Sequence, residues 1–309
     1  MATSFDPFYD LYMNNGFVPI EIVTSGIVAM ICCVGIGLNS CLVYVTIKTK
    51  SLHSPCQILI ALYAFFASFL LFGHCVKFVI FAFGINYITL QTCFYIQFVP
   101  LIGSTIALML QLCIGLDRLT GVFFPFWYNA NGKNVTFKFI IGVCCIRLIL
   151  NEFNNYIGSS AHWEKPVMCL LRDPPNQPEN YYFTNISAFV IYCGEFLCYA
   201  LIWLIVWRRK STIPENVKKL TLSLSVLMSI GLICYILNVF FTNVIIPLIN
   251  LDAFTIEYFV LPINNALFSM AYGSSAPVLY FCNAQYRSAF RTQFGHQANQ
   301  VSAVHYLNN

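Results

Sequence analysis

The chain is built from apolar runs that are each about as long as a bilayer is thick, roughly 20 residues. Hydrophobic residues make up 59% of its 309 residues and charged residues only 9%, against roughly 25% charged in a soluble domain. A soluble fold of this size needs a charged surface, which so few charges do not provide. Lipid can cover an apolar surface instead, so the composition predicts an integral membrane protein.

Seven apolar segments alternate with short polar breaks. Because lipid offers no partners for open backbone groups, each segment is expected to be a helix. The expected fold is an all-α membrane protein, a seven-transmembrane helix bundle at 22–282 between an extracellular N-terminus at 1–21 and a cytoplasmic amphipathic helix and tail at 283–309. The seven helices are expected at about 22–48, 56–83, 90–122, 134–158, 184–210, 216–246 and 254–282.

The distribution of charge predicts the orientation. Twelve of the 16 Lys and Arg residues fall in the loops after odd-numbered helices or in the C-terminal tail, and basic residues favour the cytoplasmic side of a membrane. The N-terminus is therefore expected outside, with the first helix acting as a signal anchor. No group of basic residues indicates nucleic-acid binding. Acidic residues show the opposite bias, since the outer side holds Asp6, Asp10, Glu21, Glu164, Asp173, Glu179, Asp252 and Glu257.

Two cysteines occupy the predicted outer face, where a disulfide can persist. Cys93 begins the third helix and Cys169 lies in the long loop between the fourth and fifth helices. A bridge would hold this loop over the mouth of the bundle; the alternative is two free thiols. The fourteen cysteines show no repeated CxxC spacing, so no metal site is expected.

Asp117 and Arg118 lie at the inner end of the third helix. Arg118 follows Cys93 by 25 residues, about 37 Å along a helix, so one helix would carry the bridge at one end and this arginine at the other. Arg118 could leave its acidic neighbour when the bundle opens toward a cytosolic partner. The alternative is a solvated interfacial pair.

The inner end of the seventh helix carries Pro277 and Tyr280. Pro277 removes a backbone donor and allows a kink, and Tyr280 offers a polar tip near the cytoplasm. A short amphipathic stretch follows, which suits a helix lying on the inner membrane surface. Its apolar and basic positions are Tyr286, Phe290, Phe294, Arg287 and Arg291.

Together these features resemble the rhodopsin-like G-protein-coupled receptors over nearly the whole chain. Gly37-Leu38-Asn39 is similar to the motif of helix one, Leu116 to Leu119 to the Asp/Glu-Arg-Tyr motif, and Pro277 to Tyr280 to Asn-Pro-x-x-Tyr. The run from Lys50 to Leu62, with Ile114 to Arg118, resembles nematode chemoreceptors, closest to the serpentine receptor class SX family.

The resemblance implies a chemosensory receptor that couples an extracellular small molecule or peptide to a heterotrimeric G protein. It implies a multi-pass plasma-membrane location, in the cilium of a sensory neuron. No cofactor is expected, since helix seven has no Lys for a retinal Schiff base. Helix six carries Cys234-Tyr235-Ile236-Leu237 in place of Cys-Trp-x-Pro, so a conventional switch there is not assumed.

Several polar and aromatic side chains on the outer half of the bundle are candidates for a ligand pocket, with helix packing as the alternative role of each. These are Gln97, Phe98, Leu101, Tyr192, Glu195, Asn264 and Phe268. Two glycosylation sequons begin at Asn134 and Asn185, and only Asn185 lies on the predicted outer side.

Two other classes were weighed against a receptor. A transporter or channel tends to show internal repeats and broken helices in matching halves, and neither pattern is present in the sequence. A membrane enzyme needs clustered catalytic side chains in the bundle, yet the five histidines are dispersed and mostly in loops or the tail.

Overall fold

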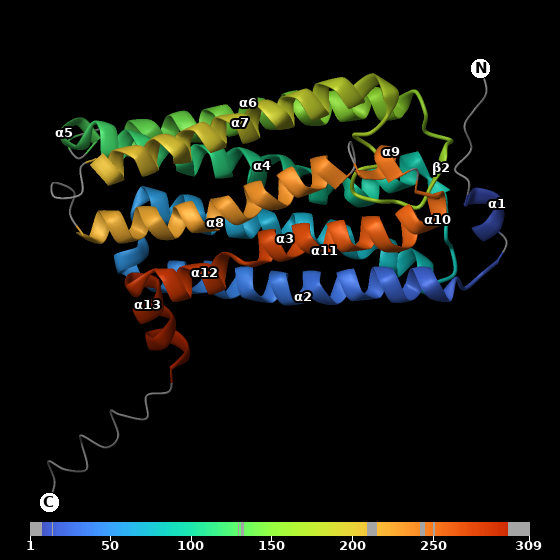
Figure 1. Ribbon diagram of the computed structural model, residues 1–309, viewed down its shortest axis with the longest axis horizontal. Helices are drawn as coiled ribbons and strands as arrows, with labels where there is room; N and C mark the ends of the chain where they lie inside the picture. Colours follow the sequence, from blue (N-terminus) through green and yellow to red (C-terminus); the bar gives the residue numbers. More distant parts are fainter. Residues whose placement is uncertain are drawn as a thin grey trace, which may run out of the picture.

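The computed structural model describes residues 8–13, 15–128, 130, 133–208, 215–241, 245–249 and 251–295. Within them, long helices run side by side along the molecule (Figure 1), which is the all-α seven-transmembrane bundle that the sequence predicts. The bundle helices are α2 (Pro19–Lys48), α3 (Pro55–Ala82), α4 (Leu90–Phe123), α6 (Lys133–Ser160), α7 (Pro178–Arg208), α8 (Glu215–Phe240) and the consecutive pair α11 (Leu261–Gly273) and α12 (Ser275–Cys282).

Shorter elements lie at the two ends of the bundle. We call the end with β1 and β2 the disulfide end and the end with α5 and α13 the arginine end (Figure 1). The short elements are α1 (Tyr9–Tyr12), η1 (Lys50–Leu52), β1 (Ile88–Thr89), α5 (Pro125–Trp127), β2 (Pro166–Val167), α9 (Ile246–Ile249), α10 (Ala253–Thr255), the π-helical turn η4 (Ile256–Val260) and α13 (Ala284–Phe294).

Local sequence explains where several helices begin. Ser54 and Gln57 form a capping box at the start of α3, and Pro55 occupies the first turn, where its missing N–H is not needed. The Thr89 side chain accepts from the backbone N–H of Thr92 at 3.3 Å at the start of α4. The predicted bounds of the first four helices lie within three residues of α2, α3, α4 and α6.

The last three helices differ from their predicted bounds. Helix α7 begins six residues earlier than predicted, at Pro178, because a proline is compatible with the first turn of a helix. Helix α8 ends at Phe240 rather than 246, and α9 starts a new turn beside Pro247, which cannot continue a preceding helix. The seventh span is not one helix but α10, η4, α11 and α12 in succession.

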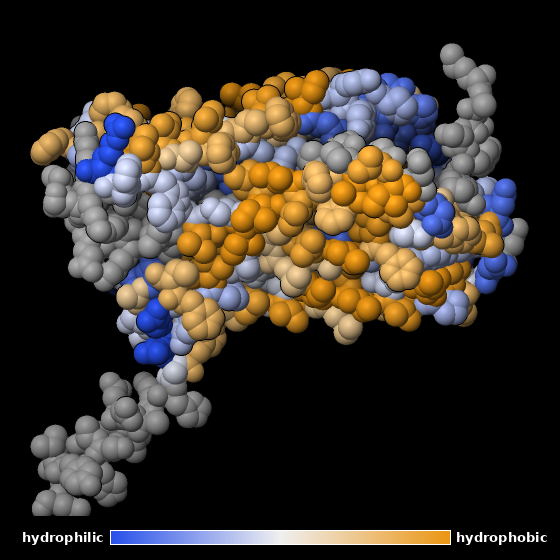
Figure 2. All heavy atoms as spheres, viewed as in Figure 1, coloured by the Kyte–Doolittle hydropathy of each residue, from blue (hydrophilic) through white to orange (hydrophobic). Residues whose placement is uncertain are grey.

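The surface of the bundle is apolar around its middle. Figure 2 shows hydrophobic colours over the centre of the visible face and hydrophilic colours gathered near the two ends. Four helical segments in the described part of the chain are long and apolar enough to cross a membrane, Pro19–Lys48, Pro55–Ala82, Leu90–Phe123 and Pro178–Ile205. The chain is therefore a membrane protein whose surface suits contact with lipid.

Helix α4 is the centre of the bundle, since it packs against α3, α6 and α7. On the other side, α2 meets α11 backbone to backbone at Gly35 and Gly273. A Cβ added to Gly273 would lie 2.8 Å from the Cα of Gly35. Beside this contact Asn39 donates from its side-chain amide to the carbonyl of Tyr272 at 3.1 Å. Small residues at such positions allow membrane helices to approach closely.

Gly273→Ala is expected to lower the thermal unfolding midpoint of the purified protein, because the new methyl group must push α2 and α11 apart. Gly37→Ala is the matched control, since a Cβ there meets nothing within 4 Å, and Ala is favoured over Gly inside a helix. Both midpoints are measured in the same detergent. An equal or smaller loss for Gly273→Ala than for Gly37→Ala would contradict the close contact.

Candidate functional site

At the disulfide end, Cys93 in the first turn of α4 is joined to Cys169 in the loop after β2. The two Cα atoms are 5.3 Å apart and both side chains are fully buried. Strands β1 and β2 pair antiparallel beside the bond. Cys169 has a positive φ of 56°, which is uncommon outside glycine, so the chain turns sharply there. The turn directs the next residues, Leu170 and Leu171, toward a cavity between the helices.

Two members of a buried ion triad, Lys77 and Glu257, line that cavity, and we call it the triad cavity. Lys77 of α3 places its Nζ 2.8 Å from Glu21 Oε2 of α2 and 2.6 Å from Glu257 Oε1 of η4. Glu21 is fully buried and the other two side chains are about nine-tenths buried. One ammonium thus faces two carboxylates, and the formal charge of the triad is one unit negative.

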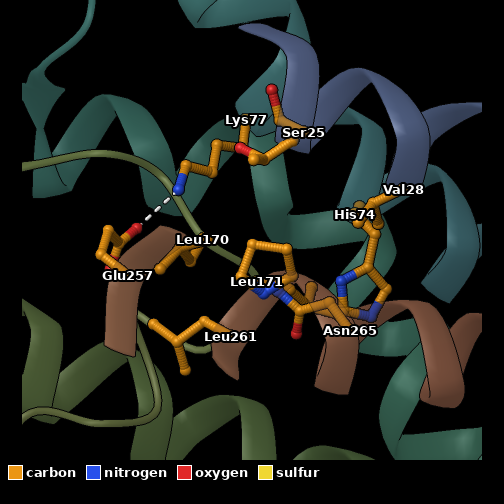
Figure 3. A pocket seen from close by; sticks show the side chains of 12 residues that line it. Ser25, Val28, His74, Lys77, Leu170, Leu171, Glu257, Leu261 and Asn265 are labelled. Atoms are coloured by element: carbon orange, nitrogen blue, oxygen red, sulfur yellow. Dashed lines mark hydrogen bonds and ion pairs between the residues drawn. The ribbon is translucent and has the colours of Figure 1, made fainter. Parts of the chain in front are cut away.

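Figure 3 shows Lys77 reaching Glu257 at one end of the triad cavity, with His74 and Asn265 at the other. The lining comes from α2, α3, η4, α11 and the loop after Cys169: Thr24, Ser25, Val28, Gly73, His74, Lys77, Leu170, Leu171, Glu257, Leu261, Pro262 and Asn265. Its free volume, measured for the centre of a water-sized sphere, is about 20 Å³. On that measure roughly 10 to 15 Å³ holds one water molecule, so the cavity admits one small polar group.

Asp173 shapes the loop above the cavity. Its carboxylate accepts from the backbone N–H of Leu170 at 2.7 Å, which closes the turn that carries Leu170 and Leu171. Burial raises the pKa of Asp173 to about 6. The loop therefore holds a carboxylate that remains mainly ionised at neutral pH.

The seven residues that the sequence suggested for a pocket do not line this cavity. Gln97 is fully buried and donates to the carbonyls of Gly73 at 3.1 Å and Cys169 at 3.2 Å. Leu101 is buried, and Phe98 is exposed on the surface of the bundle. In this conformation Gln97 links α4 to the loop, Leu101 packs in the core, and Phe98 lies on the outer surface of the bundle.

The other four suggested residues lie on α7 and α11. Tyr192 stacks on Tyr235 with ring centroids 3.7 Å apart, and its hydroxyl lies 3.4 Å from that of Tyr272. Phe268 stacks on the Tyr272 ring. In the same region Glu195, fully buried, accepts from the side chain of Gln111 at 3.0 Å, whereas Asn264 is half-buried on α11. The suggested residues therefore do not form one pocket. Gln97 contacts the loop after β2, whereas Tyr192 and Phe268 contact Tyr272.

Helices α6 and α7 are linked by the charged Arg147. Its guanidinium donates to the Ser187 hydroxyl at 2.6 Å and lies 5.3 Å from the centre of the Phe183 ring. Five residues later on α6, Glu152 accepts from the hydroxyl of Thr105 of α4 at 3.0 Å. These contacts assign both charged side chains to helix packing.

At the arginine end, Asp117 and Arg118 form a closed cluster with Tyr128. Arg118 Nε donates to Asp117 Oδ2 at 3.0 Å, and its Nη2 donates to the Tyr128 hydroxyl at 2.9 Å. The Tyr128 hydroxyl donates in turn to Asp117 Oδ1 at 2.7 Å. Burial raises the pKa of Tyr128, so this hydroxyl keeps its proton. Asp117 is fully buried, and its carboxylate is held by both neighbours.

Helix seven is interrupted near the arginine end. Pro277 has no N–H to give to the carbonyl of Gly273, and α11 and α12 are separated at Ser274. After α12, the Asn283 side chain caps α13 by accepting from the N–H groups of Gln285 and Tyr286. Arg287 donates to the backbone carbonyl of Tyr280 at 3.1 Å. Figure 1 shows α13 leaving the direction of the bundle, as an amphipathic helix at a membrane surface does.

The sequence of the chain was compared with models of known protein families. Residues 32–294, which cover most of the bundle and α13, match the model of the serpentine type 7TM GPCR chemoreceptor Srsx family. The chain belongs to the Srsx family. This confirms the resemblance to class SX receptors and makes the chain a GPCR-like chemosensory receptor of the membrane; the family is not a family of enzymes. No curated protein matches the chain.

Sequence analysis missed two features of the chain, the ion triad and the contact of Tyr128 with Asp117 and Arg118. Lys77, Glu21 and Glu257 were counted only by the side of the membrane, although a charge inside an apolar helix already indicates a partner or a function. Tyr128 was not singled out at all. Its signal was weak, since a tyrosine ten residues after Arg118 has no motif that distinguishes it from other loop aromatics.

Proposed function

We propose that this Srsx-family chain is a chemosensory receptor that couples an extracellular small molecule or peptide to a heterotrimeric G protein. In this proposal the disulfide end faces outward, the arginine end faces the cytoplasm, and the protein resides in the plasma membrane of a sensory neuron, at its cilium. The observation that carries the proposal is the position of the Asp117–Arg118–Tyr128 cluster, at the opposite end of α4 from Cys93.

The cluster supports coupling because it can exist in two states. In the closed arrangement Arg118 is occupied by Asp117 and Tyr128. Opening of the arginine end would free its planar fork of donors for carbonyl or carboxylate oxygens of a partner helix. An agonist shifts such an equilibrium by its differential affinity for the two states.

Tyr128→Phe and Asp117→Asn are both expected to raise basal nucleotide exchange by a purified G protein. Each removes hydrogen bonds that hold Arg118 in the closed state, and a charged hydrogen bond contributes about 1.5 to 3 kcal/mol. The asparagine variant should show the larger increase, roughly tenfold or more. Exchange is measured at equal receptor content in nanodiscs, with Tyr95→Phe as a control because Tyr95 is an exposed tyrosine at the other end of α4.

A transporter is the competing function. The same preparations are therefore reconstituted into liposomes and tested for flux of small ions and metabolites. Raised exchange in the two variants without flux supports a receptor. Flux together with unchanged exchange in both variants would reject the proposal.

Glycan mapping tests the proposed orientation. Asn185 lies within α7, where its side chain is exposed and donates to the carbonyl of Tyr181 at 2.8 Å. Endoglycosidase-sensitive sugar is expected at Asn185 or at neither sequon, because the helix restricts access. Asn134→Gln should then leave the mobility of the protein unchanged. Sugar mapped to Asn134 would place the arginine end outside and contradict the orientation.

A further inference from the structure

We infer that a groove between α6 and α7 binds the carboxylate of a single-chain fatty acid that enters from the lipid. The groove is lined by Arg147, Ser187 and six apolar side chains from α4, α6 and α7. Its free volume, measured for the centre of a water-sized sphere, is about 420 Å³, within the roughly 300 to 1,000 Å³ of known ligand sites. It shares no residue with the triad cavity or with the Asp117–Arg118–Tyr128 cluster, so the inference goes beyond the proposed coupling.

The first argument is the charge of Arg147. Its side chain is half-buried in the middle of α6, where a charge is costly unless it has a partner. None of the ion pairs among the described residues involves Arg147. Glu152, five residues later, directs its carboxylate to Thr105 and Asn151 instead. An anion in the groove would therefore supply the missing partner.

The second argument is the hydrogen bonding of Arg147. A guanidinium has five N–H groups, and among the described residues Arg147 uses one of them, in its packing contact with Ser187. Its Nε is buried without a hydrogen-bond partner in this part of the chain. The Phe183 ring, 5.3 Å from the guanidinium carbon, supports the group from the side. Arg147 is thus held in position with donors to spare.

These donors fit a carboxylate better than a phosphate. A guanidinium pairs with the two oxygens of a carboxylate in one plane. Among the described lining residues Arg147 is the only charged one, and Ser187 already gives its hydrogen to the carbonyl of Thr184 at 3.0 Å. A phosphate brings a third oxygen and more charge, for which this lining has no donor.

The third argument is the order of polar and apolar side chains along the groove. Helix α7 has 31 residues, about 46 Å, so a hydrocarbon layer of about 30 Å leaves about 8 Å of the helix beyond each boundary. Ser187 follows Pro178 by nine residues, about 14 Å, and thus lies about 6 Å below the boundary at the disulfide end. A carboxylate at Arg147 leaves its chain pointing toward the middle of the membrane. Four apolar lining residues lie on that side, Val143, Ile146, Val190 and Ile191.

The bilayer is the route of entry. Ile146, Leu150 and Val190 are exposed on the outer surface of the bundle, so the groove is open along its lipid-facing side. A small water-soluble anion would have to leave water and cross hydrocarbon to reach Arg147, at a high cost. A fatty acid has an apolar chain that is already at home in lipid, and it brings the carboxylate with it.

The test is photolabelling of the full-length protein in nanodiscs by palmitate that carries a diazirine in its chain. Labelled peptides are identified by mass spectrometry at about pH 8, well above the pKa of a carboxyl group, about 4. Labelling is expected on α6 and α7 beside the groove, and sodium palmitate should displace it in a saturable manner. Methyl palmitate and hexadecyltrimethylammonium have the same chain without the anion, so each should compete at least tenfold more weakly.

Variants of the two ends of the groove locate the effect. Arg147→Gln removes the charge but keeps a donor for Ser187, and it should weaken palmitate binding at least tenfold. Arg147→Lys keeps the charge without the planar fork, so its loss should be smaller. Val190→Trp fills the apolar part, should also block labelling, and serves if Arg147→Gln does not fold. Val23→Trp on α2 is its control, since both valines are 61% exposed, and it should leave labelling unchanged.

Equal competition by palmitate and its methyl ester would mean that the groove holds only apolar chains, and it would overturn the inference. Stronger competition by hexadecyl phosphate than by palmitate would assign the site to a phospholipid head group and overturn it equally. Undiminished labelling in both Arg147→Gln and Val190→Trp would place the fatty acid elsewhere and reject the groove. No G protein is present in these measurements, so they are independent of the proposed coupling.

Discussion

Arg118→Ala is expected to abolish receptor-driven nucleotide exchange while the bundle remains folded. Arg118 is the donor-rich side chain at the arginine end that both holds the closed cluster and would be released on opening. Alanine removes the fork that a G-protein helix would contact. The loss is therefore expected even where the closed state is already weakened.

The clearest measurement places Arg118→Ala in the Asp117→Asn background, since the raised basal exchange of that background needs no identified agonist. Exchange should fall to the level without receptor at matched surface expression. Arg291→Ala is the control, because Arg291 is an exposed arginine of α13. Exchange in the double variant equal to that of Asp117→Asn alone would make Arg118 an interfacial anchor and reject the mechanism.

The positions of the first four helices could be predicted because the length of an apolar run and the capping residues are both visible in the local sequence. The apolar run sets the length of α2, and Pro55 and Thr89 mark where α3 and α4 begin. Such signals do not depend on the rest of the bundle. Helix seven was predicted only in part, because Pro277 indicates the break between α11 and α12 whereas no local signal was found for the π-helical turn η4.

The Cys93–Cys169 pair was predicted from the side of the membrane on which both cysteines fall. The rest of the candidate site was predicted only where residues are close in sequence. Asp117 and Arg118 are neighbours, so their contact is local. Lys77 and Glu257 are 180 residues apart, and only the packing of α3 against the outer part of helix seven brings them together. Hydropathy assigns each charge to a side of the membrane but gives no information on its partner.

The suggested pocket shows the same limit. Gln97 and Tyr192 were suggested as polar and aromatic residues on the outer half of the bundle, and both are buried. Such a pattern does not reveal whether a buried polar group is already satisfied by the protein. Gln97 bonds two backbone carbonyls, so it is a structural link in this conformation.

Loss of the Cys93–Cys169 disulfide is expected to reduce surface expression strongly and to lower the unfolding midpoint. The bond joins cysteines that are 76 positions apart in the sequence, and removing a native disulfide costs roughly 2 to 5 kcal/mol. It also positions the turn that carries Leu170 and Leu171 into the triad cavity. Cys93→Ser and Cys169→Ser should therefore each lower both the surface level and the unfolding midpoint.

The double variant should lose little beyond either single variant, because each substitution alone already breaks the same bond. Cys145→Ser is the matched control, since Cys145 is an exposed free cysteine on α6. Surface level is measured by antibody labelling of an N-terminal tag, and unfolding midpoints are compared with and without dithiothreitol. The reductant should lower the midpoint of the wild type and of Cys145→Ser only. Strictly additive losses in the double variant would mean that the two cysteines act separately, since a shared bond can be lost only once.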